Sequence, residues 1–438
     1  MSAGFSPSKC SSLLVLLFGI LAAAGCESDG YSPAIRYVLR TDPLVINENL
    51  GEPRDHPDRP GQLPIMSAAD LYEVPNPFCP APEDKEKVDA LFNKKSLLDP
   101  TTLPADTRQK VQEALDELFG TPRDPKVEGI EAAYSEKLKL APDMLKKGSA
   151  YYRIHCLHCH GVTGNGRGPT ARWVNPHPRD YRQGLFKFQS VDQAAKQGKV
   201  LKPRREDLFR TLHDGLEGTA MPSFGLLSRG DLEALVSYVI HLSIRGEAEY
   251  VALRVAFDPE EDPVNTLHEY TKMLGQQWAE AQDNAIKPAP YRYKEADMKA
   301  SVQRGRALFL ADEAKLKEHF PGADLNALKV ASCVTCHKDY GRQAAFKFDN
   351  WGTLIKPTDL TRGIFRGGRS PVDLYYRIHS GVNGSGMITE LGKKLELREL
   401  YPSERKDLPN IDPIWDLVNF VRTLPYPAMR EKYGIQIN

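Results

Sequence analysis

Apolar positions with helical spacing occur in two widely separated parts of the chain. Each part opens and closes with a stretch that is typical of a buried helix. A further stretch carries Leu267, Leu274 and Trp278 along one side, which predicts an amphipathic helix with that side buried. The predicted helices are residues 144–152 and 231–242 for the first pair, 302–310 and 413–424 for the second, 265–285 between them, and 106–120 before them.

The beginning of the chain predicts export. Lys9 precedes an apolar run over residues 13–24, which is too short to span a bilayer comfortably and is typical of a secretory signal over residues 1–25. The letters "AAGC" resemble a bacterial lipobox, which would place a lipid on Cys26 after cleavage behind Gly25. An ordinary cleaved signal, with Cys26 as a spare thiol, is the alternative. Both interpretations predict an exported protein.

Composition limits the classes of function. The 438 residues are enough for two or three domains, and 41% hydrophobic with 26% charged residues suits a soluble protein with a packed core. Lys plus Arg and Asp plus Glu both number 58, so the formal net charge is zero. Because phosphate binding draws on a surplus of cations, we expect no nucleic acid among the partners.

The seven cysteines are distributed unevenly. Cys10 lies in the predicted signal, Cys26 is the predicted anchor, and Cys79 lies in a Pro-rich stretch. The other four form two Cys-x-x-Cys pairs. Exported proteins usually place cysteines in disulfides, but zinc sites, redox disulfides and covalent haem sites also use this spacing.

A histidine directly follows each Cys-x-x-Cys pair. Residues 156–160 read "CLHCH" and residues 333–337 read "CVTCH". C-x-x-C-H is the attachment site of haem c, because two thiols one helical turn apart add to the two vinyl groups of a porphyrin and the next imidazole faces the iron. The sequence therefore predicts two covalently bound haem c groups. The thiols would be Cys156, Cys159, Cys333 and Cys336, and the iron-binding imidazoles would be His160 and His337.

The similarity between the two halves continues beyond the motifs. Residues 178–187, "PRDYRQGLFK", match residues 357–366, "PTDLTRGIFR". Residues 207–221 align without a gap with residues 373–387, and both segments end in methionine. The order of helix, C-x-x-C-H, loop, helix, methionine and helix thus occurs twice, which predicts an internal duplication.

Each half resembles a class I-type cytochrome c domain. The resemblance implies an all-α fold in which an N-terminal and a C-terminal helix cross, with the haem beneath them. It covers residues 141–246 and 296–430, and leaves 26–140 as an N-terminal extension and 247–295 as a helical linker. In this family the motif histidine binds iron on one side and a downstream methionine sulfur on the other, which pairs His160 with Met221 and His337 with Met387.

Other histidines compete for the iron. His213 and His379 align with each other, and a bis-histidine iron would have a lower potential than a histidine–methionine iron. Each lies in a helical segment shortly before the methionine, so we expect helix-end histidines that bond backbone carbonyls or a propionate. His155 and His158 lie inside the first motif and are interpreted as bystanders.

The loops after the two motifs differ. Residues 161–169, "GVTGNGRGP", suit a backbone that wraps closely around a porphyrin. Pro169 resembles the family's proline whose carbonyl bonds the ligand histidine. The second copy has neither the glycine run nor this proline. Aromatic residues that would cover the porphyrin, or alternatively fill core, are Trp173, Tyr181, Phe186, Trp351 and Phe365.

The resemblance implies an electron-transfer protein rather than an enzyme. We expect a lipid-anchored dihaem cytochrome on the periplasmic side of the cell membrane, with other redox proteins or respiratory complex subunits as partners. One alternative is a dihaem peroxidase, which needs an open iron site, and the two methionines argue against it. The other is a zinc-binding interaction module, for which each Cys2His set lacks a nearby fourth ligand.

Overall fold

The computed structural model describes residues 31–42, 44–45, 97–174, 176–192, 202–348, 354–403 and 405–437. The predicted signal, Cys26 and Cys79 lie outside these residues. The described chain is helical, which confirms the all-α prediction. It adds two antiparallel ribbons with strands of two residues, β1 (Leu44–Val45) with β2 (Leu97–Leu98) and β3 (Lys347–Phe348) with β4 (Leu354–Ile355).

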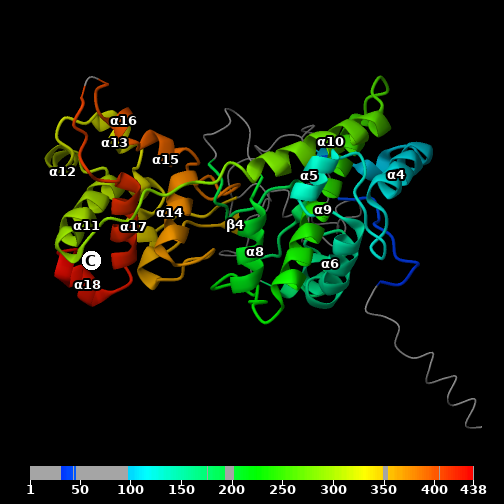
Figure 1. Ribbon diagram of the computed structural model, residues 1–438, viewed down its shortest axis with the longest axis horizontal. Helices are drawn as coiled ribbons and strands as arrows, with labels where there is room; N and C mark the ends of the chain where they lie inside the picture. The colour runs from blue at the N-terminus through cyan, green and yellow to red at the C-terminus, as the bar shows by residue number, and fades with distance from the viewer. Residues whose placement is uncertain are drawn as a thin grey trace, which may run out of the picture.

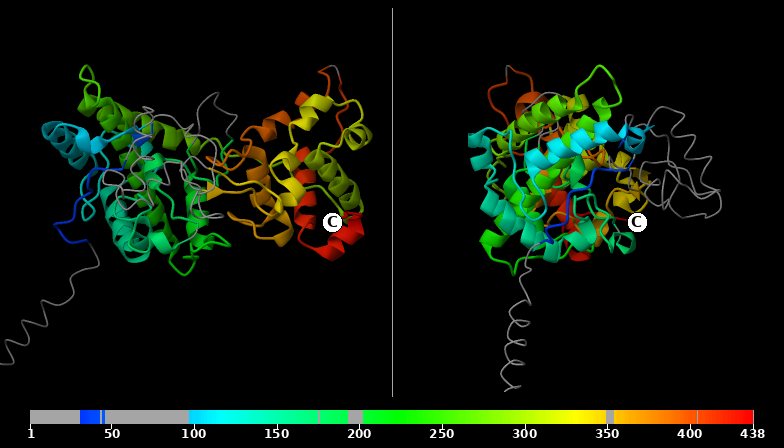
Figure 2. Two further views of the ribbon diagram at one scale, coloured as in Figure 1. Left: turned by 180° about the vertical axis from the view of Figure 1, so that it is seen from behind. Right: turned by 90° about the vertical axis from the view of Figure 1, so that its right-hand side faces the viewer.

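The helices form two lobes, which Figures 1 and 2 show side by side. The first contains α4 (Ala105–Phe119), α5 (Ala132–Lys137), α6 (Pro142–His155), α7 (Leu157–His160), α8 (Arg205–Asp214), α9 (Arg229–Val255) and α10 (Pro263–Ala281). The second contains α11 (Glu295–Leu310), α12 (Glu313–His319), α13 (Leu325–Lys329), α14 (Pro371–Ser380), α15 (Leu391–Lys394), α16 (Leu397–Leu400), α17 (Pro413–Thr423) and α18 (Pro427–Tyr433). Short 3-10 turns are η1 (Pro100–Thr102), η2 (Ala171–Trp173), η3 (Tyr181–Gln183), η5 (Cys333–Thr335), η6 (Lys338–Gly341) and η7 (Leu360–Arg362).

Each lobe has its own hydrophobic core. Helix α9 runs through the first core and is buried along most of its length, because α4, α6, α8 and α10 all pack on it. The second core lies around α11 and α17. Leu267, Leu274 and Trp278 of α10 are buried, as their spacing predicts. No helix in the described parts of the chain is both long and apolar enough to cross a membrane.

The first lobe extends beyond the segment that resembles a cytochrome. Helix α9 continues to Val255, whereas the apolar pattern predicts its end near Leu242. The part of the N-terminal extension that forms α4 and α5 packs against α9 and α10, so it contributes to the first lobe. The limits of the two predicted domains stay predictions.

The same helix crossing occurs in both lobes. A Cβ atom on Gly148 of α6 would lie 2.1 Å from the Ala234 carbonyl oxygen of α9, and one on Gly305 of α11 would lie 2.1 Å from the Asp416 carbonyl oxygen of α17. One turn further along, the rings of Tyr152 and Tyr238 have centroids 5.1 Å apart, and those of Phe309 and Phe420 are 5.4 Å apart. Glycine at each crossing allows close backbone contact.

Gly148→Ala tests this crossing. The added methyl group overlaps a backbone carbonyl, so α6 and α9 must separate, and we expect a loss of about 1–3 kcal/mol in the free energy of unfolding. Denaturant titration of the wild type and the variant measures it. Gly230→Ala, in the first turn of α9, is the control because its Cβ meets nothing nearer than 3.8 Å. If both variants lose the same free energy of unfolding, the close contact of α6 with α9 at Gly148 would be contradicted.

Candidate haem sites

The first motif lies where α6 ends. Cys156 separates α6 from the short helix α7, which carries Cys159 and His160. The two thiols and the imidazole therefore come from one helical turn. Both thiols are free, and the Cys159 sulfur is 3.3 Å from the Thr170 hydroxyl. Burial raises the pKa of Cys156 to about 12, so this thiol is protonated at neutral pH in the protein without haem.

His160 is held in one orientation. Its Nδ1 is 3.1 Å from the Arg179 carbonyl oxygen, and its ring stacks on Tyr181 with centroids 4.6 Å apart. Burial lowers the pKa of His160 to about 4, so the ring is neutral at pH 7. Since Nδ1 donates to the carbonyl, Nε2 keeps the lone pair that a metal requires.

The second motif histidine is held in the same way. The Nδ1 of His337 is 3.1 Å from the Thr358 carbonyl oxygen. Thr358 occupies the position in "PTDLTRGIFR" that Arg179 occupies in "PRDYRQGLFK". The sequence prediction assigned this role to Pro169, and for His160 it was wrong, because Arg179 supplies the carbonyl.

The aspartate after each of these carbonyls fixes the local turn. Asp180 accepts a hydrogen bond from the Arg182 backbone N–H and starts η3, and Asp359 does the same with Thr361 at η7. Each turn then ends at a left-handed glycine, Gly184 with φ 62° and Gly363 with φ 70°. The Pro-x-Asp repeat therefore builds a rigid support for one backbone carbonyl in each lobe.

The loops between each motif and its support differ in sequence and length, but in each a glycine lies between the motif and the support. Gly166 donates its N–H to the His160 carbonyl oxygen, and a Cβ there would lie 2.5 Å from the Pro178 carbonyl oxygen. Gly341 donates to the His337 carbonyl oxygen, and its Cβ would lie 2.0 Å from the Thr358 carbonyl oxygen. Each glycine thus lets the loop contact the carbonyl support closely.

In the second copy this glycine comes four residues after the histidine rather than six, and the chain reaches it through a strained backbone. Asp339 and Tyr340 have φ angles of 49° and 58°, a left-handed conformation that costs about 1–2 kcal/mol for each non-glycine residue. Tyr340 is stabilised by stacking on Phe309, with ring centroids 5.8 Å apart. The second copy therefore forms its support without the glycine run and proline of the first.

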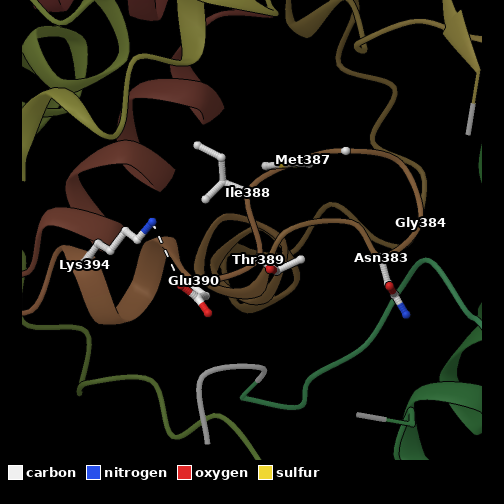
Figure 3. A pocket seen from close by; sticks show the side chains of 8 residues that line it. Asn383, Gly384, Met387, Ile388, Thr389, Glu390 and Lys394 are labelled. Carbon is white, nitrogen blue, oxygen red and sulfur yellow. Dashed lines mark ion pairs between the residues drawn. The ribbon is translucent and has the colours of Figure 1, made fainter. Parts of the chain in front are cut away.

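The two methionines lie in the loops that follow α8 and α14. Met221 is half-buried and packs against the first core, and its loop is closed by hydrogen bonds from Leu216 N–H to the Met221 carbonyl and from Phe224 N–H to the Leu212 carbonyl. Met387 is half-buried and lines an open cavity of about 420 Å³ (Figure 3). Glu390 and Lys394, 4.0 Å apart, lie at the same cavity. Iron ligation by either methionine stays a prediction.

The competing histidines lie at helix ends, as predicted, but their partners differ from the prediction. The His213 ring is largely exposed, and its Nδ1 is 2.6 Å from a carboxylate oxygen of Asp214. The Nδ1 of His379 is 3.1 Å from the Ser380 hydroxyl. A carboxylate and a hydroxyl thus replace the backbone carbonyls that we expected, and the alternative bond to a haem propionate stays a prediction.

The aromatic residues divide into two groups. Tyr181 and Phe186 are buried and stack next to His160, with centroids 6.0 Å apart, and Phe365 is buried in the second core. Trp173 is 69% exposed and contacts Arg172, so it does not fill core, and its expected place over a porphyrin stays a prediction. Trp351 lies outside the described residues.

The lobes meet between the two sites. Arg210 of α8 reaches Asp373 of α14 at 3.3 Å, and Arg369 pairs with Glu217 in the loop that carries Met221. A Cβ on Gly218 in that loop would lie 2.7 Å from Ile364. Figure 1 shows α8 and α14 facing each other at this junction.

The donor set of each site fits haem c. Two free thiols, one imidazole with a committed Nδ1 and a downstream thioether are the groups that covalent attachment and iron ligation need. Among the residues that the structure describes, no group of three or more His, Cys, Asp or Glu side chains is arranged to hold a metal ion.

Comparison with known proteins agrees with the first site. Residues 143–239 match the family described as cytochrome C oxidase, cbb3-type, subunit III, and this segment contains Cys156, Cys159, His160 and Met221. The match supports a cytochrome c domain here, with haem c as its cofactor and electron transfer as its role.

One solved structure is similar to the chain. It belongs to the Kuenenia stuttgartiensis reducing HAO-like protein complex Kustc0457/Kustc0458, at 24% identity and a TM-score of 0.41, covering 64% of this chain and 96% of that one. No curated protein is significantly similar in sequence.

Asp359→Ala tests the carbonyl support. Loss of the turn cap should lower the free energy of unfolding by about 1 kcal/mol. In the haem-loaded protein it should also shift the midpoint potential of the second haem, since the Thr358 carbonyl is no longer fixed. Asp99→Ala removes the matching cap at η1, where Asp99 accepts from the Thr101 backbone N–H and hydroxyl, and should reduce stability without shifting the second haem. If the midpoint potential of the second haem is the same in both variants, the Thr358 carbonyl does not act as the proposed support for His337.

Proposed function

We propose that the chain is an exported, lipid-anchored dihaem cytochrome c that transfers electrons between other redox proteins. The observation that supports it most directly is the repeated geometry of the motif histidines. In each lobe the Nδ1 of the motif histidine lies 3.1 Å from the backbone carbonyl oxygen of the middle residue of the Pro-x-Asp segment. A disulfide would not require this support. A zinc-bound histidine would also use it, but among the described residues no three His, Cys, Asp or Glu side chains are grouped to hold a metal ion.

In this proposal each site has the same division of roles. Cys156 and Cys159, and Cys333 and Cys336, form thioether bonds. His160 and Met221 bind the first iron, and His337 and Met387 the second. Haem c supplies a one-electron ferrous–ferric couple when bound, and a thioether ligand favours the ferrous state.

The surrounding residues hold these ligands still. Burial keeps His160 neutral, and the fixed carbonyls prevent its ring and that of His337 from turning. A ligand set that does not rearrange keeps the structural change on electron transfer small. The protein therefore suits electron relay rather than chemistry on a substrate.

The proposed location follows from the beginning of the sequence. A lipid on Cys26 would anchor the chain on the periplasmic side of the cell membrane, and a signal without lipidation would release it into the periplasm. Its partners would be other redox proteins, among them subunits of a respiratory complex.

Haem counting tests the proposal. We expect two covalently bound haems per chain, measured by pyridine haemochrome absorbance per protein and by intact mass. Replacing Cys156 and Cys159 with alanine should remove one haem, and replacing Cys333 and Cys336 should remove the other. A single haem in the wild type, or a zinc content of one per motif, would refute a dihaem cytochrome.

A peroxidase is the second candidate function. The observation that favours it is that Met221 packs against the first core, whereas Met387 is not among the described residues packed against the second. Carbon monoxide separates the two, because it binds ferrous haem only where the sixth position is open or displaceable. We expect no spectral change in the reduced wild type and a clear change in Met387→Ala. A change in the wild type that Met387→Ala does not increase would favour the peroxidase.

A further inference from the structure

A segment from the N-terminal extension lies against the first lobe. The Tyr37 hydroxyl is 2.7 Å from that of Tyr238 on α9, and the Arg40 backbone N–H donates to Glu249 at 2.8 Å. Tyr37, Arg40 and Asp42 are all buried. This segment, residues 31–42, is absent from the part of the chain that resembles a cytochrome, yet it is built into the first lobe.

Asp42 ends this segment in a buried ion pair with Arg182. The two Arg182 terminal nitrogens donate to the two Asp42 carboxylate oxygens at 2.9 and 3.1 Å. The same guanidinium donates to Asp180 at 3.0 and 2.7 Å. Arg182 is thus clamped between two carboxylates, and one of them directly follows the Arg179 carbonyl that orients His160.

Helix α9 packs against the backbone end of the Arg182 side chain. A Cβ on Gly246 would lie 2.4 Å from the Arg182 Cβ, so the helix backbone contacts the arginine directly. Asp42 and Asp180 hold the Arg182 guanidinium, and α9 packs against its Cβ, so the side chain is fixed at both ends. A displacement at Asp42 is therefore transmitted to the turn that holds the Arg179 carbonyl.

The second lobe lacks this arrangement and provides an internal control. Thr361 stands where the first copy has Arg182. Its hydroxyl donates to Asp359 at 2.7 Å, so the aspartate is satisfied within its own turn. The carbonyl support of His337 has no equivalent arginine to connect it with a distant segment.

We propose that residues 31–42 set the potential of the first haem through the buried charges of Arg40 and Asp42, which join Arg182 and Asp180 beside the turn that positions His160. The inference rests on the proposed haem function. It gives the N-terminal extension a role in the first site alone and predicts two haems that respond differently to the same substitution.

The charges near Asp42 give the effect a sign. Asp42 and Asp180 face Arg182 and Arg40, with Arg40 3.4 Å from Asp42. Burial alone would raise the pKa of Asp42, but the guanidinium groups of Arg182, Arg40 and Arg167 hold it well below its usual range, so Asp42 is charged at neutral pH. Buried charges are poorly screened. Removing the carboxylate disfavours ferric iron and raises the potential, while removing the Arg40 cation lowers it.

Redox titration of the visible spectrum of the full haem-loaded chain tests the inference. Met221→His identifies the first haem, because histidine in place of methionine lowers its potential. We expect Asp42→Asn to shift that haem's midpoint upward and Arg40→Gln to shift it downward, with the second haem unchanged in both variants. Asp283→Asn, which breaks an exposed pair with Lys137, is the control and should shift neither.

Shifts of the same sign in Asp42→Asn and Arg40→Gln, equal shifts of both haems, or no shift would overturn the inference. If Asp42→Asn does not fold, Arg40→Gln tests the inference alone, since that variant keeps the Arg40 backbone bond to Glu249. A downward shift in the midpoint potential of the first haem alone would support the inference, and any other result would overturn it. A wild type with one haem would instead refute the dihaem function, and that result comes from haem counting without any Asp42 variant.

Discussion

The hydrogen bond from Nδ1 of each motif histidine to one backbone carbonyl is the constraint around which both lobes are arranged. It fixes the tautomer, so that Nε2 is available to a metal, and it fixes the ring plane. A backbone carbonyl holds a ring only if its own turn is rigid. The Pro-x-Asp repeat provides this rigidity with an aspartate cap before the turn and a left-handed glycine after it.

The rest of each lobe brings the motif to this carbonyl. The crossing of α6 with α9, and of α11 with α17, holds the helix on which each motif depends, and a glycine at each crossing sets the separation. The first motif directly follows α6, whereas the second follows α13 and packs back on α11. The loops between motif and carbonyl then differ in length, and in each a glycine donates to the histidine carbonyl and contacts a carbonyl of the Pro-x-Asp segment. One loop uses several glycines, and the other accepts strain at Asp339 and Tyr340. Different backbones therefore satisfy one hydrogen bond.

The sequence predicted the parts of this arrangement that depend on local pattern. The C-x-x-C-H motifs, the helices at each end of both halves and the buried side of α10 follow from spacing, whereas the crossing of those helices was implied by the resemblance to cytochrome c domains. The acceptor for His160 was misassigned to Pro169, because any residue can supply a backbone carbonyl and no side chain marks it. The end of α9 was missed because Arg245 and Glu249 interrupt the apolar pattern, although they are buried as an ion pair. The contact between Asp42 and Arg182 joins residues 140 positions apart, and the spacing of apolar residues cannot predict such a pair.

The most direct test of the shared support is proton NMR of the reduced, haem-loaded protein with ¹⁵N-labelled histidine. Two imidazole Nδ1–H signals should be protected from solvent exchange, one with nuclear Overhauser contacts to the α-proton of Arg179 and the other to that of Thr358. A single protected signal, or contacts from the His160 ring proton to Pro169, would contradict it.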